Sequence, residues 1–174
     1  MPEAEPTGIL EALERFERPL LRFAATIAGP EAARDAVQDV FLELCREPWD
    51  KVRGHLAPWL FTVCRNKAIS QRRKNKRHND VEDSDVIDEP ERVPDQAFER
   101  KEAETRISKA MAGLNARDRE VVALKFAGGL SYKEIAEVTK LSVSHVGVIL
   151  HEALKKVRDK LAVEDDVVLE GRRA

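Results

Sequence analysis

The sequence predicts an all-α protein in which two small helical domains are joined by a flexible acidic linker. Apolar residues recur at helical spacing along most of the 174 residues, and few stretches show the period of two that marks a strand. Aromatic residues make up only 5% of the chain and charged residues 36%, which suits small helical bundles better than a sheet. Residues 79–97 are acidic, contain Pro90 and Pro94 and lack a helical stripe, so we expect them to form the linker.

Charge is distributed unevenly along the chain, although the net charge is only −2. Residues 65–78 contain seven Lys or Arg and no acid, whereas residues 80–91 contain seven Asp or Glu and no base. The basic run is denser than a solvated helix face usually is, so we expect it to contact nucleic acid. A plain tether explains the acidic run, and a specific use of its negative charge is the alternative.

Three helices are predicted in the N-terminal part. The first, residues 8–28, contains Pro19, where we expect a kink or a break, and its apolar stripe comprises Ile9, Leu13, Phe16, Leu20, Phe23 and Ile27. After a turn at Gly29-Pro30, the second, residues 31–46, points inward with Ala33, Val37, Val40, Phe41 and Leu44. A connector, residues 49–55, precedes the third, residues 58–77, whose buried side comprises Trp59, Leu60, Val63, Cys64 and Ile69.

Further helices, with clear signals at their ends, are predicted in the C-terminal part of the chain. A helix from about Asp95 has the stripe Ala103, Ile107, Ala110, Met111 and Leu114. Asn115 caps the next helix, which ends at Gly128-Gly129, and Ser131 with Glu134 forms a capping box for a short helix over 132–139. After the turn 140–142, a helix of four to five turns buries Val146, Ile149, Leu150, Ala153, Leu154, Val157 and Leu161. Its outer face carries Ser144, Val148, His151, Lys155 and Arg158.

The last two helices have the arrangement of a helix-turn-helix, which presents its second helix to the major groove of DNA. A polar outer face alone is typical of any amphipathic helix. The capped short helix in front of it favours DNA binding. The basic helix and the helix-turn-helix therefore predict two separate nucleic-acid surfaces, one suited to single-stranded or melting DNA and one to duplex DNA.

No enzyme, cofactor or metal site is expected from the motifs. The chain has no P-loop, GxSxG, HExxH or Cys/His nucleophile pattern, and Asp35 and Asp39 lack the partners that a metal site needs. Cys45 and Cys64 form no CxxC, and we expect both to be buried free thiols. Without a signal peptide or a long apolar run, we expect a cytoplasmic protein with no membrane span.

Nearly the whole chain resembles the extracytoplasmic-function sigma factors, the small two-domain sigma factors of bacterial RNA polymerase. The resemblance lies in DAVQDVFLEL (35–44), APWLFTVCRNKAISQRRK (57–74) and LNARDREVVALKFAGGLSYKEIAEVTKLSVSHV (114–146), in this order. It implies a region 2 domain at 1–78, a linker at 79–97, a region 4 helix-turn-helix domain at 98–163 and a tail at 164–174. The tail is expected to be a short helical extension or disordered.

The resemblance also implies partners and residue roles. Binding to core RNA polymerase would involve Glu31, Asp35, Gln38 and Asp39. Contact with and melting of the −10 element would involve Arg53, His55, Phe61, Arg65, Asn66, Lys67, Arg72, Arg73 and Lys74. The −35 element would be contacted by Tyr132, Lys133, Ser142, Ser144, His145, Val148, His151 and Lys155. The acidic linker would occupy the RNA exit path, and an anti-sigma factor is a possible partner.

Three departures from the family pattern carry hypotheses. The acidic run that usually precedes Asp35 is replaced by residues 32–34 (Ala-Ala-Arg), which suggests a weaker or partner-assisted grip on core polymerase. Ser70 stands where the family usually has Asp. Residues 147–149 (Gly-Val-Ile) stand where the family commonly has Lys, Ser and Arg, which predicts an A·T-leaning −35 element or weak dependence on it.

Two other functions compete with a sigma factor. One is a helix-turn-helix regulator that binds duplex DNA without polymerase, although it leaves the basic helix unexplained. The other is a small nucleic-acid enzyme, which the missing catalytic site disfavours. Control of activity is left open, and packing of the two domains against each other, with the acidic linker over the basic helix, is one hypothesis for a resting state.

Overall fold

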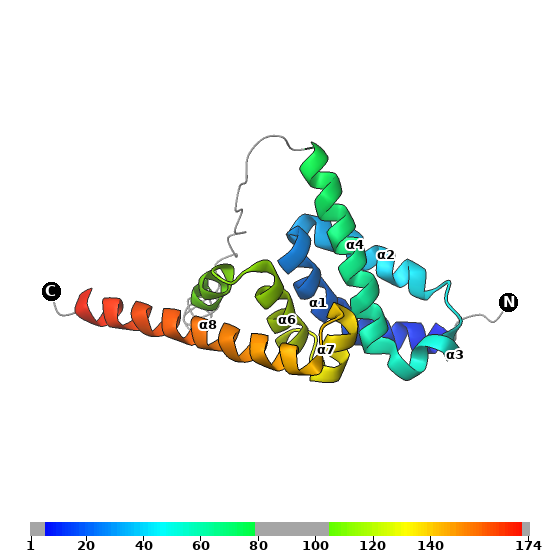
Figure 1. The fold of residues 1–174 in the computed structure, drawn as a ribbon. Coiled ribbons are helices and arrows are strands. Elements are labelled where there is room, and N and C mark those ends of the chain that lie inside the picture. The colour runs from blue at the N-terminus through cyan, green and yellow to red at the C-terminus, as the bar shows by residue number, and fades with distance from the viewer. Residues whose placement is uncertain (1–5, 79–104, 172–174) are drawn as a thin grey trace.

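The computed structural model describes residues 6–78 and 105–171, and all regular structure within these ranges is helical. The all-α prediction is therefore confirmed. The elements are α1 (Pro6–Ala28), α2 (Pro30–Leu44), α3 (Trp49–Val52), a 3₁₀ turn (Arg53–His55) and α4 (Leu56–His78), then α6 (Ala116–Phe126), α7 (Tyr132–Thr139) and α8 (Val143–Gly171), as Figure 1 shows. Residues 105–112 are also helical. The expected linker at 79–97 and the start of a helix near Asp95 lie outside the described residues.

The N-terminal unit, residues 6–78, is built on α1, α2 and α4, which pack against one another. Gly29 adopts φ 84°, a left-handed conformation that suits glycine, and this lets the chain reverse between α1 and α2. Proline at the first turn of α2 has no N–H to lose there. Leu20, Phe23, Val40, Leu44 and Leu60 are fully buried and form the centre of the unit.

Pro19 lies inside α1 without ending it, so of the expected kink or break the break does not occur. Proline removes one backbone hydrogen bond from the helix. Leu20 and Phe23 follow it directly and are both completely buried. Their burial holds the next turn in place and offsets the missing bond.

The connector over 49–55 is more ordered than the sequence predicted, because it contains α3 and the 3₁₀ turn. Helices this short show no apolar periodicity to detect. The Trp49 ring packs so closely on α1 that a methyl group added at Gly8 would collide with it. Val52 is buried as well, so the segment is anchored by side chains at both ends of α3.

The C-terminal unit, residues 105–171, confirms the predicted end signals. Asn115 Oδ1 accepts a hydrogen bond from the Asp118 N–H at 2.8 Å, and the capping box between Ser131 and Glu134 is complete. Gly129 after α6 has φ 67°, and Lys140 in the turn between α7 and α8 has φ 61°. Both left-handed residues end a helix by turning the chain sharply.

Several burial predictions are corrected. Cys45 is exposed, because it follows the last residue of α2, whereas Cys64 is buried. Ile107 and Leu154 are exposed, although both fall on predicted apolar stripes. Helix α8 continues to Gly171, which is the helical one of the two forms expected for the tail, and Figure 1 shows its C-terminal end projecting beyond the other helices.

The two units pack against each other. Helix α1 contacts α6, α4 contacts α7, and buried residues of both units form one continuous hydrophobic core. Figure 1 shows α4 lying beside α7 at the centre of the molecule. The helix expected to contact the −10 element therefore lies against the helix-turn-helix.

Candidate polymerase and nucleic-acid interfaces

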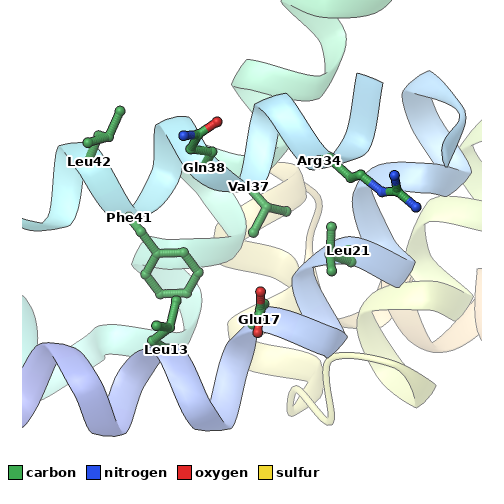
Figure 2. A pocket seen from close by; sticks show the side chains of 8 residues that line it. All are labelled: Leu13, Glu17, Leu21, Arg34, Val37, Gln38, Phe41 and Leu42. Carbon is green, nitrogen blue, oxygen red and sulfur yellow. The ribbon is translucent and has the colours of Figure 1, made fainter. Parts of the chain in front are cut away.

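The outer face of α2 combines acidic residues with an apolar groove. Glu31, Asp35 and Gln38 are exposed and Asp39 is half-buried. Beside them, α1 and α2 enclose an open groove, shown in Figure 2, lined by Leu13, Glu17, Leu21, Arg34, Val37, Gln38, Phe41 and Leu42. Side chains of Val37 and Phe41 point from α2 toward α1, whereas Gln38 and Leu42 point away from it.

Leu42 adds an apolar element that the sequence reasoning missed. Its side chain is 50% exposed at the rim of the groove. A signal for it was present, because Leu42 is an apolar residue outside the buried stripe of α2. The structure also shows which of the three residues before Asp35 can affect polymerase binding. Ala32 and Ala33 are buried, and only Arg34 is exposed. Acids at 32 and 33 would face the core, so Arg34 alone changes the charge of this surface.

The basic surface of α4 lies at its C-terminal end. Arg72, Arg73 and Lys74 are exposed, as is Asn66 one and a half turns earlier. Ahead of the helix, Arg53 and His55 are exposed, and Arg53 forms a solvent-exposed ion pair with Asp50 at 3.2 Å. The exposed Arg72, Arg73 and Lys74 can approach a phosphate backbone, which attracts cations without regard to sequence.

Three other residues expected to contact the −10 element are engaged within the protein. Phe61 is completely buried and packs edge-to-face on Phe23, with ring centroids 5.4 Å apart, so its expected place on a DNA-facing surface is corrected. Lys67 pairs with Glu43 of α2 at 2.8 Å, and the hydrogen bond to this carboxylate raises the pKa of Lys67. Arg65 forms a bidentate pair with Glu120 of α6.

The Arg65–Glu120 pair joins the two units and was not predicted. The Arg65 side chain is 29% exposed and the Glu120 side chain 13%, so water screens the pair only in part. Nothing in the sequence distinguishes Glu120 from Asp118, the other acid of α6. Its role depends on how the units pack, which no local pattern specifies.

All eight residues expected to contact the −35 element are exposed on α7, α8 and the turn between them, namely Tyr132, Lys133, Ser142, Ser144, His145, Val148, His151 and Lys155. Val146, Ile149, Leu150 and Ala153 are buried and fix the opposite face of α8 on the C-terminal unit. Ser142 has a structural task too, because its Oγ accepts a hydrogen bond from the His145 N–H at 3.2 Å. This bond caps the N-terminus of α8.

Electrostatic contacts stabilise the helix-turn-helix. Glu134 accepts hydrogen bonds at 2.7 Å from the Ser131 N–H and hydroxyl, and these bonds lower the pKa of the Glu134 carboxyl. On α8, Lys156 pairs with the buried Asp118 of α6 at 3.1 Å. Lys156 therefore stabilises the packing of α8 on α6, whereas the neighbouring Lys155 is exposed and can contact DNA.

Within residues 6–78 and 105–171, no group of three or more His, Cys, Asp or Glu side chains is arranged to hold a metal ion. None of the described helices is long and apolar enough to cross a membrane.

Comparison with known proteins identifies the family. The family models for Sigma-70 region 2 and Sigma-70 region 4 match residues 12–78 and 104–157. The ECF RNA polymerase sigma factor SigL of Mycobacterium tuberculosis is 33% identical over 148 residues, which are 80% of this chain and 80% of SigL. This chain belongs to the ECF RNA polymerase sigma factors. The ECF sigma factor RpoE of Cereibacter sphaeroides is 28% identical over 134 residues, covering 75% of this chain and 72% of RpoE.

Two solved structures share the fold of this chain. The sigma factor RpoE of Bartonella quintana, in complex with the anti-sigma factor NepR, is 26% identical, with a TM-score of 0.67 over 90% of this chain and 98% of that one. The fold also matches CnrH in complex with the cytosolic domain of CnrY, with a TM-score of 0.61 over 92% of this chain and 89% of that one, at 23% identity. The chain is thus an RNA polymerase sigma factor, a type of transcription initiation factor, and nothing favours the autonomous regulator or the enzyme.

Proposed function

We propose that this sigma factor binds core RNA polymerase through α2, contacts the −10 element through α4 and contacts the −35 element through α7 and α8. The observation that carries the proposal is the presence of a basic helix and an exposed helix-turn-helix in separate units of one chain. We assign residues 1–78 to region 2, 79–97 to the linker, 98–163 to region 4 and 164–174 to a tail. The site of action is the cytoplasm, where bacterial polymerase meets DNA.

The proposed polymerase site is the α1–α2 groove together with the acids of α2. An apolar groove with a charged rim suits a helical partner, because the partner buries its apolar stripe in the groove and aligns its cations with the rim. Gln38 lines this groove, Asp35 is exposed on the same helix, and Leu42 supplies apolar surface that is exposed in the free protein. The partner that the family resemblance implies is the clamp-helix pair of the polymerase largest subunit.

The proposed −10 site is the C-terminal half of α4. Arg72, Arg73 and Lys74 would hold the phosphates on either side of the melting region, and the salt dependence of binding would report their number. Asn66 is an exposed hydrogen-bonding residue of the same helix and would contact a base. Phe61 would serve the core of region 2 and not the DNA, in line with its complete burial.

An anti-sigma factor is a further proposed partner. The similarity to the NepR-bound sigma factor covers 90% of this chain, so both units have counterparts in a sigma factor that an anti-sigma factor holds. The exposed apolar rim of the α1–α2 groove and the helix-turn-helix surface would be the faces to cover.

A titration of labelled chain with core RNA polymerase tests the proposed function. We expect saturable binding that Leu42→Ala weakens at least fivefold, the effect of about 1 kcal/mol at an interface position. Arg34→Glu should tighten binding by restoring an acid beside Asp35. The matched control is Leu10→Ala, because Leu10 is 59% exposed on α1 but does not line the groove. Absence of saturable binding by the unmodified chain would overturn the proposal.

A further inference from the structure

We infer that the −35 element of this sigma factor contains a thymine whose 5-methyl group packs on Val148. The inference rests on the proposed function, because it assigns a base contact to the same surface of α8.

Val148 lies near the start of α8 and is 54% exposed. Val146, Ile149 and Leu150 are buried on either side of it in sequence, and they hold the helix so that Val148 faces outward. At 100° per residue, Val148 shares its face with a set of exposed residues, Ser144, His145, His151, Glu152 and Lys155. A major groove that accepts this face would meet Val148 at its centre.

The charges around Val148 disfavour the usual contact with guanine. No Lys or Arg occurs from Val143 to Leu154, although Arg and Lys are the residues that most often read guanine. Glu152 on the same face is repelled by phosphate. An exposed isopropyl group in the major groove finds only one apolar partner on the base edges, the C5-methyl group of thymine.

Gly147 enlarges the space for this contact. It presents no side chain, and a methyl group added there would lie 3.7 Å from Cε2 of Tyr132. The Lys125 ammonium lies over the Tyr132 ring, 5.4 Å from the ring centroid, and helps to hold it in place. Tyr132 and Val148 thus expose apolar surface next to a stretch of bare backbone, which lets DNA approach the helix closely.

Thymine-to-uracil replacement tests the inference with holoenzyme assembled from the full chain and core polymerase. Selection from a promoter library randomised at the −35 element should return at least one invariant thymine. Uracil at that position removes only the methyl group, and wild-type holoenzyme should bind about fourfold more weakly, the equivalent of roughly 0.8 kcal/mol for one buried carbon. Holoenzyme with Val148→Ala should bind both DNAs equally.

Val163→Ala is the matched control. Val163 is 63% exposed on the same helix, 15 residues or roughly 22 Å further along, so its truncation should leave the fourfold effect intact. The inference is overturned if Val148→Ala keeps the sensitivity to uracil, or if selection returns no thymine. The proposed function fails separately, by absence of holoenzyme assembly or of transcription with every −35 sequence.

We propose, from an independent observation, that the packing of the two units is a closed resting state that must open before a promoter is bound. The −10 and −35 elements lie about 25 base pairs apart, which is roughly 85 Å of duplex DNA. In the structure α4 directly contacts α7, so the two DNA-facing surfaces cannot reach both elements together.

Specific contacts hold the closed state. Arg65 of the basic helix donates from both Nε and Nη2 to the Glu120 carboxylate, which ties a residue that the family resemblance places at the −10 element to the C-terminal unit. The turn after α6 also passes close to the N-terminal unit, because a methyl group added at Gly128 would lie 2.9 Å from Cζ of Phe61, besides meeting Leu124 O and Leu130 Cδ1 of its own unit at 2.7 and 2.8 Å. Closure thereby neutralises a cation of α4 and holds this helix against α7.

Pulsed electron-spin distance measurement between labels at Cys45 and at Val163→Cys tests closure. Cys45 is exposed, whereas burial raises the pKa of Cys64 to about 12 and leaves it unlabelled. We expect one narrow distance for the free chain. Glu120→Lys should shift the equilibrium between the closed and open states about fivefold toward the open state, which gives longer and broader distances. Binding of core polymerase should also lengthen and broaden the distances.

Glu137→Lys serves as the control, because it makes the same charge change at an exposed position of α7. It should leave the narrow distance unchanged. A broad distribution in the unmodified free chain, or a narrow one in Glu120→Lys, would contradict the closed state.

Discussion

At the scale of single residues, burial distinguishes residues that stabilise the core from residues that can contact DNA, a difference that the sequence did not show. Phe61 and Arg72 both lie in the predicted −10 segment, and their spacing alone does not distinguish them. The structure buries Phe61 against Phe23 and leaves Arg72 in solvent. The basic residues at the end of α4 were predictable because charge is visible in sequence. The burial of Phe61 was not, because it depends on which face of α4 meets α1.

Phe61→Ala should therefore act on stability and not on DNA contact. Removing a completely buried aromatic side chain should lower the free energy of unfolding by about 3–5 kcal/mol. Urea denaturation followed by circular dichroism measures this change. Arg72→Ala is the comparison, with stability within about 0.5 kcal/mol of the wild type and weaker binding to −10 DNA. A Phe61→Ala protein of unchanged stability would refute the structural role.

At the scale of elements, end signals predicted the helix-turn-helix well and interior patterns predicted it less well. Helix α7 spans Tyr132–Thr139 as expected, because the capping box and the left-handed Lys140 define both ends locally. Helix α8 continues through the tail to Gly171, which is the helical one of the two forms expected there, because no glycine or proline interrupts it between Val148 and Glu170. Leu154 lies on the predicted stripe yet is exposed, because periodicity does not say where the covering helices end.

The capping box makes the stability of the helix-turn-helix pH-dependent. The pKa of Glu134 is lowered in the folded state, so its contribution is fully present above the ordinary value of 4.5 and is lost as the pH falls through the folded-state pKa. Thermal unfolding of the wild type and of Glu134→Gln from pH 7 to pH 3 measures this contribution. The two melting temperatures should converge at the acidic end, and a difference independent of pH would be inconsistent with the ionised cap.

The variant Gly147→Ala distinguishes the effect of Gly147 on the stability of α8 from its effect on how closely DNA approaches the helix. Glycine inside a helix is less stable than alanine by about 1 kcal/mol, and the space beside Tyr132 accepts a methyl group at ordinary contact distance. The variant should unfold at a higher temperature while its holoenzyme binds the −35 element more weakly. A rise in both stability and affinity would show that the bare backbone at 147 serves no close contact.

At the scale of the whole molecule, the two units combine an interface for polymerase with two surfaces for DNA. The family, the all-α fold and the order of the segments were predictable, because each depends on local motifs in sequence. Packing of the two domains against each other was only a hypothesis, and the contacts of α1 with α6 and of α4 with α7 were not predicted, since they depend on surfaces far apart in the chain. The Glu120–Arg65 pair and the apolar rim at Leu42 follow from that assembly and from the packing of α1 on α2.

Run-off transcription with mapped start sites tests the central claim most directly. Core polymerase with and without the chain would transcribe a library of promoter sequences. We predict start sites that appear only with the chain, that disappear when Arg72, Arg73 and Lys74 are all replaced by Ala, and that share a common −35 element. If the chain adds no start site to core polymerase yet binds duplex DNA tightly by itself, it is an autonomous regulator and the account is contradicted.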